Sequence, residues 1–352
     1  MPVFDFRGTW TALVTPYKED SAVDFEGLKK NIGFQIDQGV TGVLPVGTTG
    51  ESPTLTTDEH NLVVQKAREY AGKGCDIFAG TGSNSTAEAI NHTKHALDTG
   101  IDKVLLVDCY YNGPSSLELR REYYQAVLDR FPDVKIVIYV IPGRTGTVID
   151  PVDIAVLSGE YDRVIAIKEA TGDLERMKRE RALMPDMNII SGDDDKTCRM
   201  MTDPMIRAGG VISVTSNLAP GAVVKMVGAA LRGDADEAKK LAEELKPLFS
   251  IVTVKAESVR ILPDGDKTTV QDRFRNPLPV KTAMRALGMP AGPARPPLGK
   301  MTREGVDVVR NTLKSVWEES PHVLEPINTF YGTDIEKRLN DDKVWEPLAY
   351  EG

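Results

Sequence analysis

The sequence predicts an α/β fold, namely a (β/α)8 TIM barrel with a C-terminal helical extension. The first observation is a series of eight short apolar runs, spaced roughly 20 to 35 residues apart. The second is that each gap holds a segment with helical spacing of apolar residues, and strand–helix alternation is typical of a parallel sheet. The third is length, because eight such units over about 220 residues fit a barrel better than an open doubly wound sheet.

Eight apolar runs define the strands of the predicted barrel. They cover residues 9–14, 42–46, 77–80, 103–107, 135–139, 164–168, 187–191 and 210–214. The sixth run reads Val-Ile-Ala-Ile before a lysine, and an unbroken apolar run of this kind is typical of a strand covered on both faces. In such a barrel the active site lies at the carboxyl ends of the strands. Functional residues are therefore expected directly after each run.

Capping signals mark the starts of the intervening helices. Asp24 precedes a helical spacing of apolar residues. Thr56, with a glutamate three residues later, fits a capping box, in which each side chain bonds the backbone N–H of the other residue. Ser85 with Glu88 fits the same pattern. Asp150 before a proline predicts an N-cap followed by proline at the first helical position.

The chain after residue 218 lies outside the eight units and predicts a helical extension. Helices are expected over residues 220–231, 234–248, 280–287 and 302–317. An insertion near residues 255–276 is polar and contains a Pro-Asp-Gly turn, which fits either a small hairpin or a long surface loop. We therefore predict a barrel over residues 1–218, a C-terminal helical region over 219–316 and an additional tail over 317–352. Aromatic residues in the tail indicate that it docks on something rather than being disordered.

Composition and charge narrow the class of function. The chain has 352 residues, a net charge of −9 and no basic block, which argues against nucleic acid as the main partner but not against an anionic small-molecule substrate. Three widely spaced cysteines without a CxxC pair predict reduced thiols in a cytoplasmic protein. No run approaches ~18 apolar residues, and residues 1–5 show no signal-peptide pattern, so neither a membrane span nor secretion is expected.

The histidines and a run of three aspartates are the candidate metal ligands of this sequence. The four histidines form no ligand set with metal-binding spacing, so we predict no metal. His92 and His95 share one face of a predicted helix, where we expect them to be solvated. Residues 193–195 are three consecutive aspartates, which suggest either a cation site or a helix N-terminus. We expect the second, because the helix dipole favours negative charge there.

Lys168, at the end of the sixth predicted strand, is the first candidate for chemistry. A buried lysine is costly unless it is paired or uncharged. A free amine at a barrel mouth is a good nucleophile toward carbonyl groups. We therefore expect Lys168 to form a covalent imine with a 2-oxo acid, without any other cofactor. The stretch taken alone leaves a second interpretation open, in which Lys168 pairs with Glu169.

Other strand ends also carry polar residues. Residues 47–52 read Gly-Thr-Thr-Gly-Glu-Ser, whose backbone N–H groups and hydroxyls fit either a carboxylate cradle or a plain polar turn. Two adjacent tyrosines follow the fourth strand. Tyr139 and Arg144 lie at the end of the fifth, where a tyrosine relays protons and an arginine binds a carboxylate at two points. A core tyrosine with a surface arginine is the alternative there.

Together these strand ends resemble one known family. Residues 47–52, Tyr111, residues 139–146 and residues 167–172 fall at consecutive strand ends of one barrel. In these segments the chain is similar to the dihydrodipicolinate synthase / N-acetylneuraminate lyase family of class I aldolases. The resemblance extends from about residue 6 to about residue 313. The pattern Tyr-x-x-Pro-x-Arg-Thr-Gly in residues 139–146 resembles the synthase branch rather than the sugar-acid lyases.

The resemblance implies a lyase of lysine (diaminopimelate) biosynthesis. This family condenses pyruvate with L-aspartate 4-semialdehyde to give 4-hydroxy-tetrahydrodipicolinate. Lys168 matches its imine-forming lysine. Thr49, Tyr139 and Tyr111 match its proton-relay residues, and the resemblance implies that Tyr111 is supplied across a dimer interface. The family is commonly a homotetramer built as a dimer of dimers.

The resemblance also implies where substrates and a regulator bind. Thr48 and Thr49 match residues that hold the pyruvate carboxylate, and Arg144 matches the arginine that receives the carboxylate of the aldehyde. Gly192 and Ile212 match positions that line the pocket through backbone groups. Part of the family is inhibited by L-lysine at the dimer interface. The positions that match the inhibitor site are Ser52, His60, Asn84, Glu88 and Tyr110.

Some features depart from the family pattern. Asp108 and Cys109 stand where the family usually has threonine-proline, and Thr57 stands where lysine-sensitive members often have histidine, so we expect weak inhibition. The insertion and the tail are additional. One alternative is a related pyruvate-dependent aldolase or dehydratase acting on a sugar acid, against which Arg144 argues, because a neutral polyol tail gains little from a guanidinium. The other alternative is a catalytically silent regulatory homologue. The presence of Lys168 together with Tyr139, Thr49 and Arg144 argues against it.

Overall fold

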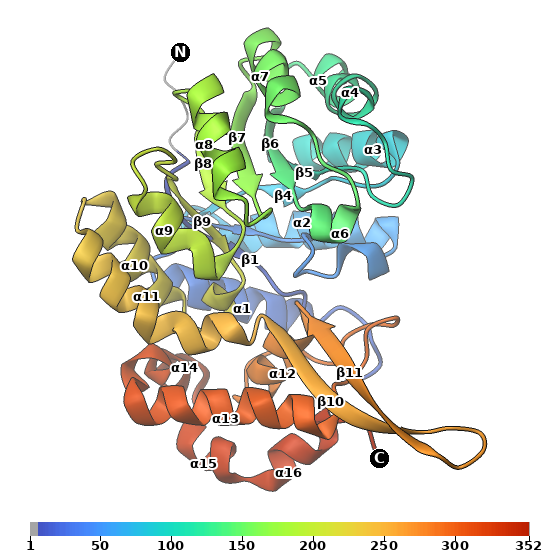
Figure 1. The fold of residues 1–352 in the computed structure, drawn as a ribbon, viewed down its shortest axis with the longest axis vertical. Helices are drawn as coiled ribbons and strands as arrows, with labels where there is room; N and C mark the ends of the chain where they lie inside the picture. Colours follow the sequence, from blue (N-terminus) through green and yellow to red (C-terminus); the bar gives the residue numbers. More distant parts are fainter. Residues whose placement is uncertain (1–5, 352) are drawn as a thin grey trace.

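The predicted barrel is confirmed by a computed structural model that describes residues 6–351; the expected absence of a signal peptide concerns residues outside this range. Parallel strands form one sheet in the order β3-β2-β1-β9-β8-β7-β6-β5-β4, and helices surround it (Figure 1). The strands are β1 (Gly8–Ala12), β2 (Gly42–Leu44), β3 (Asp76–Ile77), β4 (Ala79–Gly80), β5 (Lys103–Val107), β6 (Lys135–Val140), β7 (Val164–Glu169), β8 (Asn188–Ser191) and β9 (Gly210–Ser213).

The third barrel strand is interrupted, which is why nine segments replace the eight predicted strands. Phe78 alone separates β3 from β4; β3 pairs with β2, and β4 pairs with β5. The two ends of the strand order therefore meet at Phe78, and the sheet closes on itself. The ring of Phe78 is fully buried and packs edge-on against Phe6 and Trp10, at centroid distances of 5.4 and 5.0 Å.

The helices with predicted capping signals begin where those signals predict. The helices around the barrel are α1 (Phe25–Asp37), η1 (Ser52–Thr54), α2 (Thr57–Ala71), α3 (Thr86–Asp98), α4 (Ser116–Glu118), η2 (Leu119–Tyr124), α5 (Gln125–Arg130), α6 (Pro142–Thr145), α7 (Pro151–Glu160), α8 (Leu174–Leu183), η3 (Asp194–Lys196), α9 (Thr197–Thr202), η4 (Thr215–Asn217) and α10 (Pro220–Leu231). Asp24 accepts from Gly27 N at 2.9 Å, and the Thr56 capping box is present. Asp150 accepts from Val152 N at 2.8 Å.

Two predictions about α3 are wrong. The Ser85 side chain makes no cap bond, because the carboxylate of Glu88 accepts from the hydroxyl of Ser83 instead. His92 is buried rather than solvated, and its ring stacks on His60 with centroids 3.9 Å apart. The reason is that α3 packs against α2 along the face that carries His92. Helical spacing showed that two histidines share a face, but it could not show what that face touches.

The chain beyond the barrel forms helices that gather on one side of it (Figure 1). They are α11 (Ala235–Ser250), α12 (Leu278–Ala286), α13 (Arg303–Glu319), η5 (Pro321–Val323), α14 (Glu325–Tyr331), α15 (Ile335–Asn340), α16 (Asp342–Trp345) and η6 (Glu346–Leu348). The tail docks on the first barrel helix, as its aromatic residues suggested. Phe330 and Tyr331 pack on Phe34, each with ring centroids 5.2 Å apart, and the Tyr331 hydroxyl donates to Asn31 Oδ1 at 3.0 Å.

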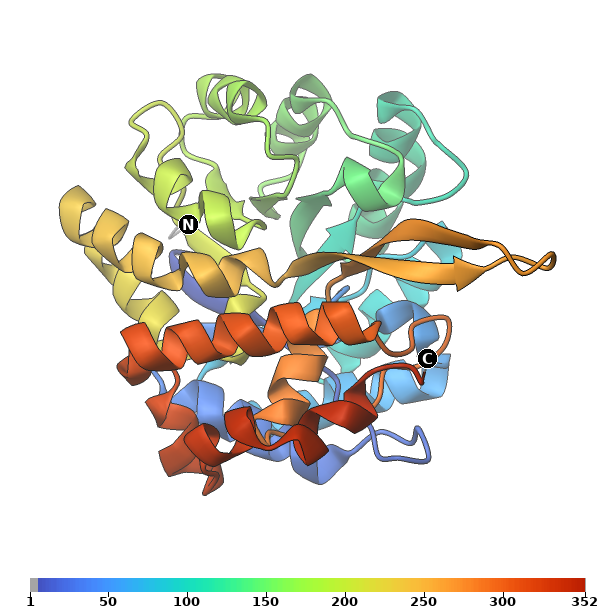
Figure 2. The same ribbon diagram turned by 60° about the horizontal axis from the view of Figure 1, so that its bottom comes forward.

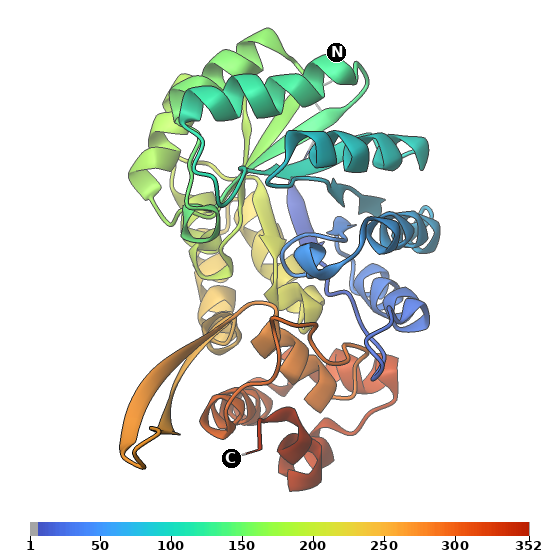
Figure 3. The ribbon, with the colours of Figure 1, turned by 90° about the vertical axis from the view of Figure 1, so that its right-hand side faces the viewer.

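The insertion is a hairpin rather than a loop. Strands β10 (Thr253–Ile261) and β11 (Lys267–Arg275) pair antiparallel along their whole length. The base of the hairpin packs on α13, where a Cβ at Gly305 would lie 3.1 Å from the ring of Phe274. Figure 2 shows the hairpin crossing in front of the barrel, and Figure 3 shows its outer turn reaching away from the C-terminal helices. The base and the outer turn therefore have different surroundings.

Candidate active site

Lys168 points into the barrel beside Tyr139. The two residues are register partners on the neighbouring parallel strands β7 and β6, so their side chains lie on the same side of the sheet. Lys168 is 5% exposed, and its Nζ lies 4.1 Å from the centroid of the Tyr139 ring. The unbroken apolar run before Lys168 therefore places its amine inside the barrel, near the carboxyl ends of the strands.

Gly192, directly after β8, makes room for the lysine. A Cβ at this position would lie 3.1 Å from Lys168 Cε and 2.8 Å from the Cβ of Ala170. Contacts this short require the neighbours to shift, so any larger residue would displace the lysine side chain. The backbone N–H of Gly192 also donates to the carbonyl of Glu169, which ties this turn to β7.

The alternative in which Lys168 pairs with Glu169 is wrong. Glu169 is fully buried and accepts from Arg176 Nε at 2.9 Å and from Thr171 Oγ1 at 2.7 Å. Successive side chains on a strand point to opposite faces, so Glu169 leaves the barrel interior where Lys168 enters it. Among residues 6–351, no carboxylate forms an ion pair with the Lys168 ammonium. The amine is buried without a counter-ion.

Burial is what makes Lys168 reactive near neutral pH. It lowers the pKa of Lys168 to about 7, and the guanidinium of Arg144 acts in the same direction. The carboxylates of Asp193 and Asp194 oppose this lowering but do not cancel it. A substantial fraction of the amine is therefore unprotonated at pH 7, whereas an ordinary lysine with a pKa near ~10.4 would be almost entirely charged.

Asp193 belongs to the site although sequence reasoning passed over it. It lines the cavity around Lys168, and burial raises its pKa to about 6, helped by the charges of Asp195 and Asp194. Asp194 begins η3 and turns away, accepting from the backbone N–H groups of Val214 and Thr215 at 3.0 and 2.9 Å. The interpretation as a helix N-terminus thus fits Asp194 and Asp195. Asp193 lies two residues after the end of β8, and this position at a strand end was the signal that distinguished it from Asp194 and Asp195.

The Gly-Thr-Thr-Gly turn after β2 carries two site residues. A Cβ at Gly50 would lie 2.9 Å from the backbone nitrogen of Val46, so the tight turn needs glycine there. Thr49 is 2% exposed, and Thr48 lines the same cavity as Tyr139. Burial raises the pKa of Tyr139, so its hydroxyl is protonated and able to donate at neutral pH. The turn after β2 and the end of β6 thus both supply hydroxyl groups to the cavity.

Asn276, at the base of the hairpin, joins the two sides of the site. Its carbonyl accepts from Arg144 Nη2 at 2.8 Å, and its side-chain Nδ2 donates to Thr49 Oγ1 at 2.9 Å. Its side-chain Oδ1 is buried and has no hydrogen-bond partner among the described residues. Sequence reasoning missed Asn276, because it belongs to the end of the insertion and lies 227 positions from Thr49.

Six predicted residues line one cavity of about 270 Å³. They are Thr48, Thr49, Tyr139, Arg144, Lys168 and Gly192. Ile212 is fully buried in β9 and does not line the cavity, whereas Val214 does. Tyr111 does not line the cavity either. It is 90% exposed and has a left-handed backbone with φ of 78°, a conformation that costs a non-glycine residue of the order of 1–3 kcal/mol.

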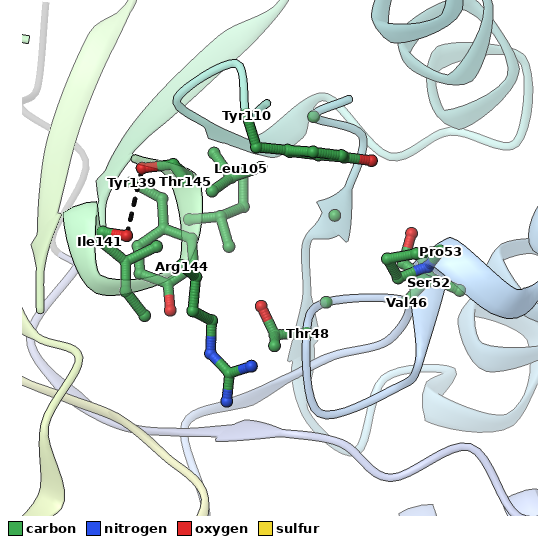
Figure 4. Close-up of a pocket in the computed structure, with 14 residues that line it drawn as sticks. Val46, Thr48, Ser52, Pro53, Leu105, Tyr110, Tyr139, Ile141, Arg144 and Thr145 are labelled. Carbon is green, nitrogen blue, oxygen red and sulfur yellow. Dashed lines mark hydrogen bonds between the residues drawn. The ribbon is translucent and has the colours of Figure 1, made fainter. Parts of the chain in front are cut away.

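A second cavity of about 210 Å³ adjoins the first and shares Thr48, Tyr139 and Arg144 with it. Figure 4 shows Tyr110 on one side of this cavity and Ser52 on the other. The remaining residues of the predicted lysine site are placed differently. Asn84 and Glu88 are exposed. His60 is 2% exposed and lies behind the cavity wall, with its Nε2 2.9 Å from the carbonyl of Gly80.

Residues 6–351 contain neither a membrane-spanning helix nor a metal-binding group. None of the helices there is both long enough and apolar enough to cross a membrane. The same part of the chain contains no group of three or more His, Cys, Asp or Glu side chains able to hold a metal ion.

A parallel barrel with a buried, unpaired lysine at its mouth, beside a tyrosine and an arginine, defines a lyase of the class I aldolase type. Comparison with known proteins agrees with this class. The chain belongs to the dihydrodipicolinate synthetase family, whose sequence pattern matches residues 5–316. The tail beyond residue 316 lies outside the matched part.

Individual relatives match most of the chain. The chain is 40% identical over 310 residues to the 4-hydroxy-tetrahydrodipicolinate synthase of Methanococcus vannielii, covering 88% of this chain and 98% of the relative. Its fold is similar to that of the dihydrodipicolinate synthase from Acinetobacter baumannii complexed with pyruvate (TM-score 0.78, 35% identity, 88% and 98% of the two chains). It is equally similar to that from Cyanidioschyzon merolae with lysine bound (TM-score 0.79, 30% identity, 88% and 98%).

Proposed function

We propose that this enzyme is a 4-hydroxy-tetrahydrodipicolinate synthase, which condenses pyruvate with L-aspartate 4-semialdehyde in lysine biosynthesis. The observation that carries the proposal is the buried Lys168 amine, held without a counter-ion beside Tyr139. Relatives at about 40% identity with this name, and the pyruvate complex of a structural neighbour, support it. Arg144 in the same cavity favours an aldehyde that carries a carboxylate over a neutral sugar chain.

The first step is imine formation on Lys168. The neutral amine attacks C2 of pyruvate, and the carbinolamine loses its hydroxyl as water after proton transfer from Tyr139. The hydroxyls and backbone N–H groups of Thr48 and Thr49 bind the pyruvate carboxylate. Because the cavity wall around Lys168 is dry, the neutral amine is favoured before the attack.

The second step joins the two substrates. The protonated imine withdraws electrons, so C3 of pyruvate gives up a proton to the relay of Tyr139, Thr49 and Tyr111, and an enamine forms. The enamine attacks the aldehyde carbon, whose oxygen takes up a proton and becomes the 4-hydroxyl. Arg144 holds the carboxylate of the aldehyde. The amino group that came from L-aspartate 4-semialdehyde then attacks the imine carbon and displaces Lys168. This step closes the ring and frees the amine of Lys168.

The relay requires a second copy of the chain. Tyr111 does not line the cavity of its own subunit, and its exposed, strained position suits a residue that acts in a neighbouring subunit. We infer a homotetramer built from two such dimers, in the cytoplasm, where the three free cysteines stay reduced. Sedimentation equilibrium measures the assembly state. A Tyr111→Phe variant mixed with a Lys168→Ala variant tests the sharing, because mixed dimers would contain one intact site.

We infer L-lysine as a feedback inhibitor that binds the second cavity, between Ser52 and Tyr110, as the lysine complex of a structural neighbour suggests. Glu88 would hold the side-chain amine of the inhibitor, and Asn84 and Tyr110 its carboxylate. Inhibition is expected only at millimolar L-lysine, because Thr57 replaces the histidine of sensitive relatives. A Glu88→Gln variant should lose inhibition and keep its uninhibited rate. A flat activity curve for the wild type would end this assignment.

Borohydride trapping tests the central step. Incubation with pyruvate followed by borohydride should add the mass of the reduced pyruvyl group to the peptide containing Lys168. A coupled assay with L-aspartate 4-semialdehyde or with sugar-acid aldehydes then separates the synthase from a sugar-acid aldolase. Trapping without turnover on any aldehyde would indicate the catalytically silent homologue, and absence of trapping would contradict both enzymes.

A further inference from the structure

The inserted hairpin contributes side chains to the cavity around Lys168. Although β10 and β11 lie outside the barrel, Thr253, Arg273 and Arg275 line this cavity together with Arg144. Figure 2 shows the hairpin passing in front of the barrel. The insertion therefore adds two guanidinium groups to the site that the barrel alone does not supply.

Both added arginines lie on one face of the hairpin. Arg275 is the register partner of Thr253, and Arg273 is that of Lys255, so these positions alternate with the opposite face. The one nearby carboxylate on β11, that of Asp272, points to the other face and pairs with Arg260 at 2.7 Å. The face turned toward the cavity also carries Glu257 of β10, but its lysine and arginine residues outnumber this one carboxylate, so the face keeps a net positive charge.

The arginines are held close to one another without a counter-ion. Arg275 Nη1 donates to the carbonyl of Gly143 at 2.9 Å, which fixes it against the short helix that carries Arg144. Among residues 6–351 no carboxylate forms an ion pair with Arg144, Arg273 or Arg275. Burial lowers the pKa of Arg144, and the charges of Arg275 and Arg273 lower it further, as expected for neighbouring cations. The lining of the cavity carries these three guanidinium groups and one carboxylate, that of Asp193, so it is positively charged overall, and such a lining attracts and binds anions.

We propose that Arg273 and Arg275 form, with Arg144, the binding subsite for the carboxylate of the acceptor aldehyde, and that the hairpin thereby selects anionic acceptors. Arg144 alone is a limited partner, because its Nη2 already donates to the carbonyl of Asn276. A guanidinium from the hairpin supplies the further donors that a two-point contact requires. The inference rests on the proposed imine chemistry at Lys168 and assigns specificity for the second substrate only.

The donor substrate is not what the hairpin recognises. Pyruvate must place its keto carbon at Lys168 Nζ, next to Thr48 and Thr49 in the barrel wall. Arg273 is exposed and Arg275 is half-buried, so both lie toward the entrance side, where the second substrate arrives. Loss of the hairpin arginines should therefore affect the aldehyde and leave pyruvate almost unchanged.

The test compares Arg273→Gln, Arg275→Gln and the double variant with Lys267→Gln. Lys267 lies on the same hairpin face and carries the same charge, but it is at the outer end and does not line the cavity. The double variant should raise the KM for L-aspartate 4-semialdehyde about ten- to hundredfold, the size expected for lost charge-assisted hydrogen bonds. The KM for pyruvate and the borohydride trapping at Lys168 should stay within about twofold of wild type in every variant.

Each outcome separates the two proposals. If the double variant and Lys267→Gln give the same semialdehyde KM, the hairpin subsite is wrong while the synthase assignment stands. If the wild type cannot be trapped with pyruvate, the proposed function fails and this inference fails with it. Arg275→Gln also removes the bond to the carbonyl of Gly143, so its effect on KM combines two causes. Arg273→Gln is the decisive single change, because the Arg273 side chain makes no such bond within residues 6–351. An unchanged semialdehyde KM in Arg273→Gln would contradict the role of Arg273 in the subsite.

Discussion

Two buried lysines in this molecule have opposite surroundings. Lys168 lies at the mouth of the barrel, and Lys281 lies in α12 where that helix meets the turn after β2. Lys168 is 5% exposed and Lys281 is 1% exposed. Each ammonium nitrogen also lies over a tyrosine ring, 4.1 Å from the centroid of Tyr139 and 4.3 Å from that of Tyr17. Burial and aromatic contact therefore do not distinguish the two residues.

Hydrogen bonding distinguishes them. Lys281 Nζ donates to the Glu51 carboxylate at 2.5 Å and to the carbonyls of Pro293 and Thr15 at 2.9 and 3.3 Å. Burial lowers the pKa of Lys281 to about 8, and the Glu51 carboxylate opposes that lowering. Lys168 has no such set of acceptors. An amine whose ammonium form is satisfied serves structure, whereas one left unsatisfied in a cavity is available as a nucleophile.

The largest expected effect is that of Lys168→Met. Turnover should fall on the order of 10⁶-fold, the scale of losing a covalent nucleophile. The free energy of unfolding should rise by about 1–2 kcal/mol, because the change removes a buried amine that the fold does not satisfy. The coupled assay and urea denaturation measure the two effects. A loss of stability would mean that Lys168 also has a structural role, which would erase the contrast with Lys281.

Lys281→Met should act in the opposite way. It leaves the Glu51 carboxylate buried without its partner, so the free energy of unfolding should fall by about 3–5 kcal/mol. Below the unfolding transition, pyruvate should still be trapped on Lys168. Adding Glu51→Gln, which removes the orphaned charge, should recover a large part of the stability. Urea denaturation of the single and double variants measures this coupling.

The two tyrosines sharpen the same comparison. Tyr139→Phe keeps the ring over Lys168 but removes the relay hydroxyl, so kcat should fall about 10²- to 10⁴-fold. Tyr17→Phe keeps the ring over Lys281, and its kcat should stay within about twofold of wild type. The free energy of unfolding should not fall, because the Tyr17 hydroxyl is buried without a hydrogen-bond partner among residues 6–351. Steady-state kinetics on both variants measures the difference. Equal losses of kcat would mean that the hydroxyl of Tyr139 has no special role.

The smallest expected effect is a pH dependence. The pKa of Lys168 is lowered to about 7, so the reactive free amine increases as pH rises through 7 and is complete well above it. Imine formation, measured as trapped protein after a fixed borohydride quench, should rise about tenfold from pH 6 to pH 8 and then level off. Asp193→Asn removes a charge that opposes the lowering, so the midpoint should move to lower pH. A rise that continues to pH 10 would indicate an ordinary lysine.

The barrel and the core of the site could be predicted because each depends on local sequence. An apolar run ending in a lysine determines a buried strand, and the carboxyl end of that strand determines where Lys168 points. Thr48 and Arg144 follow from the same rule, because they come shortly after other strands of the barrel, whereas Gly192 was expected from the family resemblance. The roles of these residues rest on the family resemblance as well, since a polar turn by itself does not reveal what it binds.

Most of the rest depends on contacts between distant parts of the chain. Asn276 joins the site through the end of an insertion whose pairing the sequence left open. Arg273 and Arg275 join it because the hairpin crosses the barrel. Ser85 fails to cap α3 because the hydroxyl of Ser83 competes for the same carboxylate. The hairpin residues were missed because their contacts join distant parts of the chain, whereas the error at Ser85 comes from a competing local hydrogen bond.

The docking of the tail on α1 has a consequence for how the chain is made. Asn31 is synthesised 300 residues before its partner Tyr331. During synthesis, the aromatic face of α1 around Phe34 therefore remains uncovered until α14 has emerged from the ribosome. In a nascent chain we expect the amide groups of α1 to be among the last to reach native protection from hydrogen exchange. The uncovered aromatic face of α1 would also be a binding site for a chaperone.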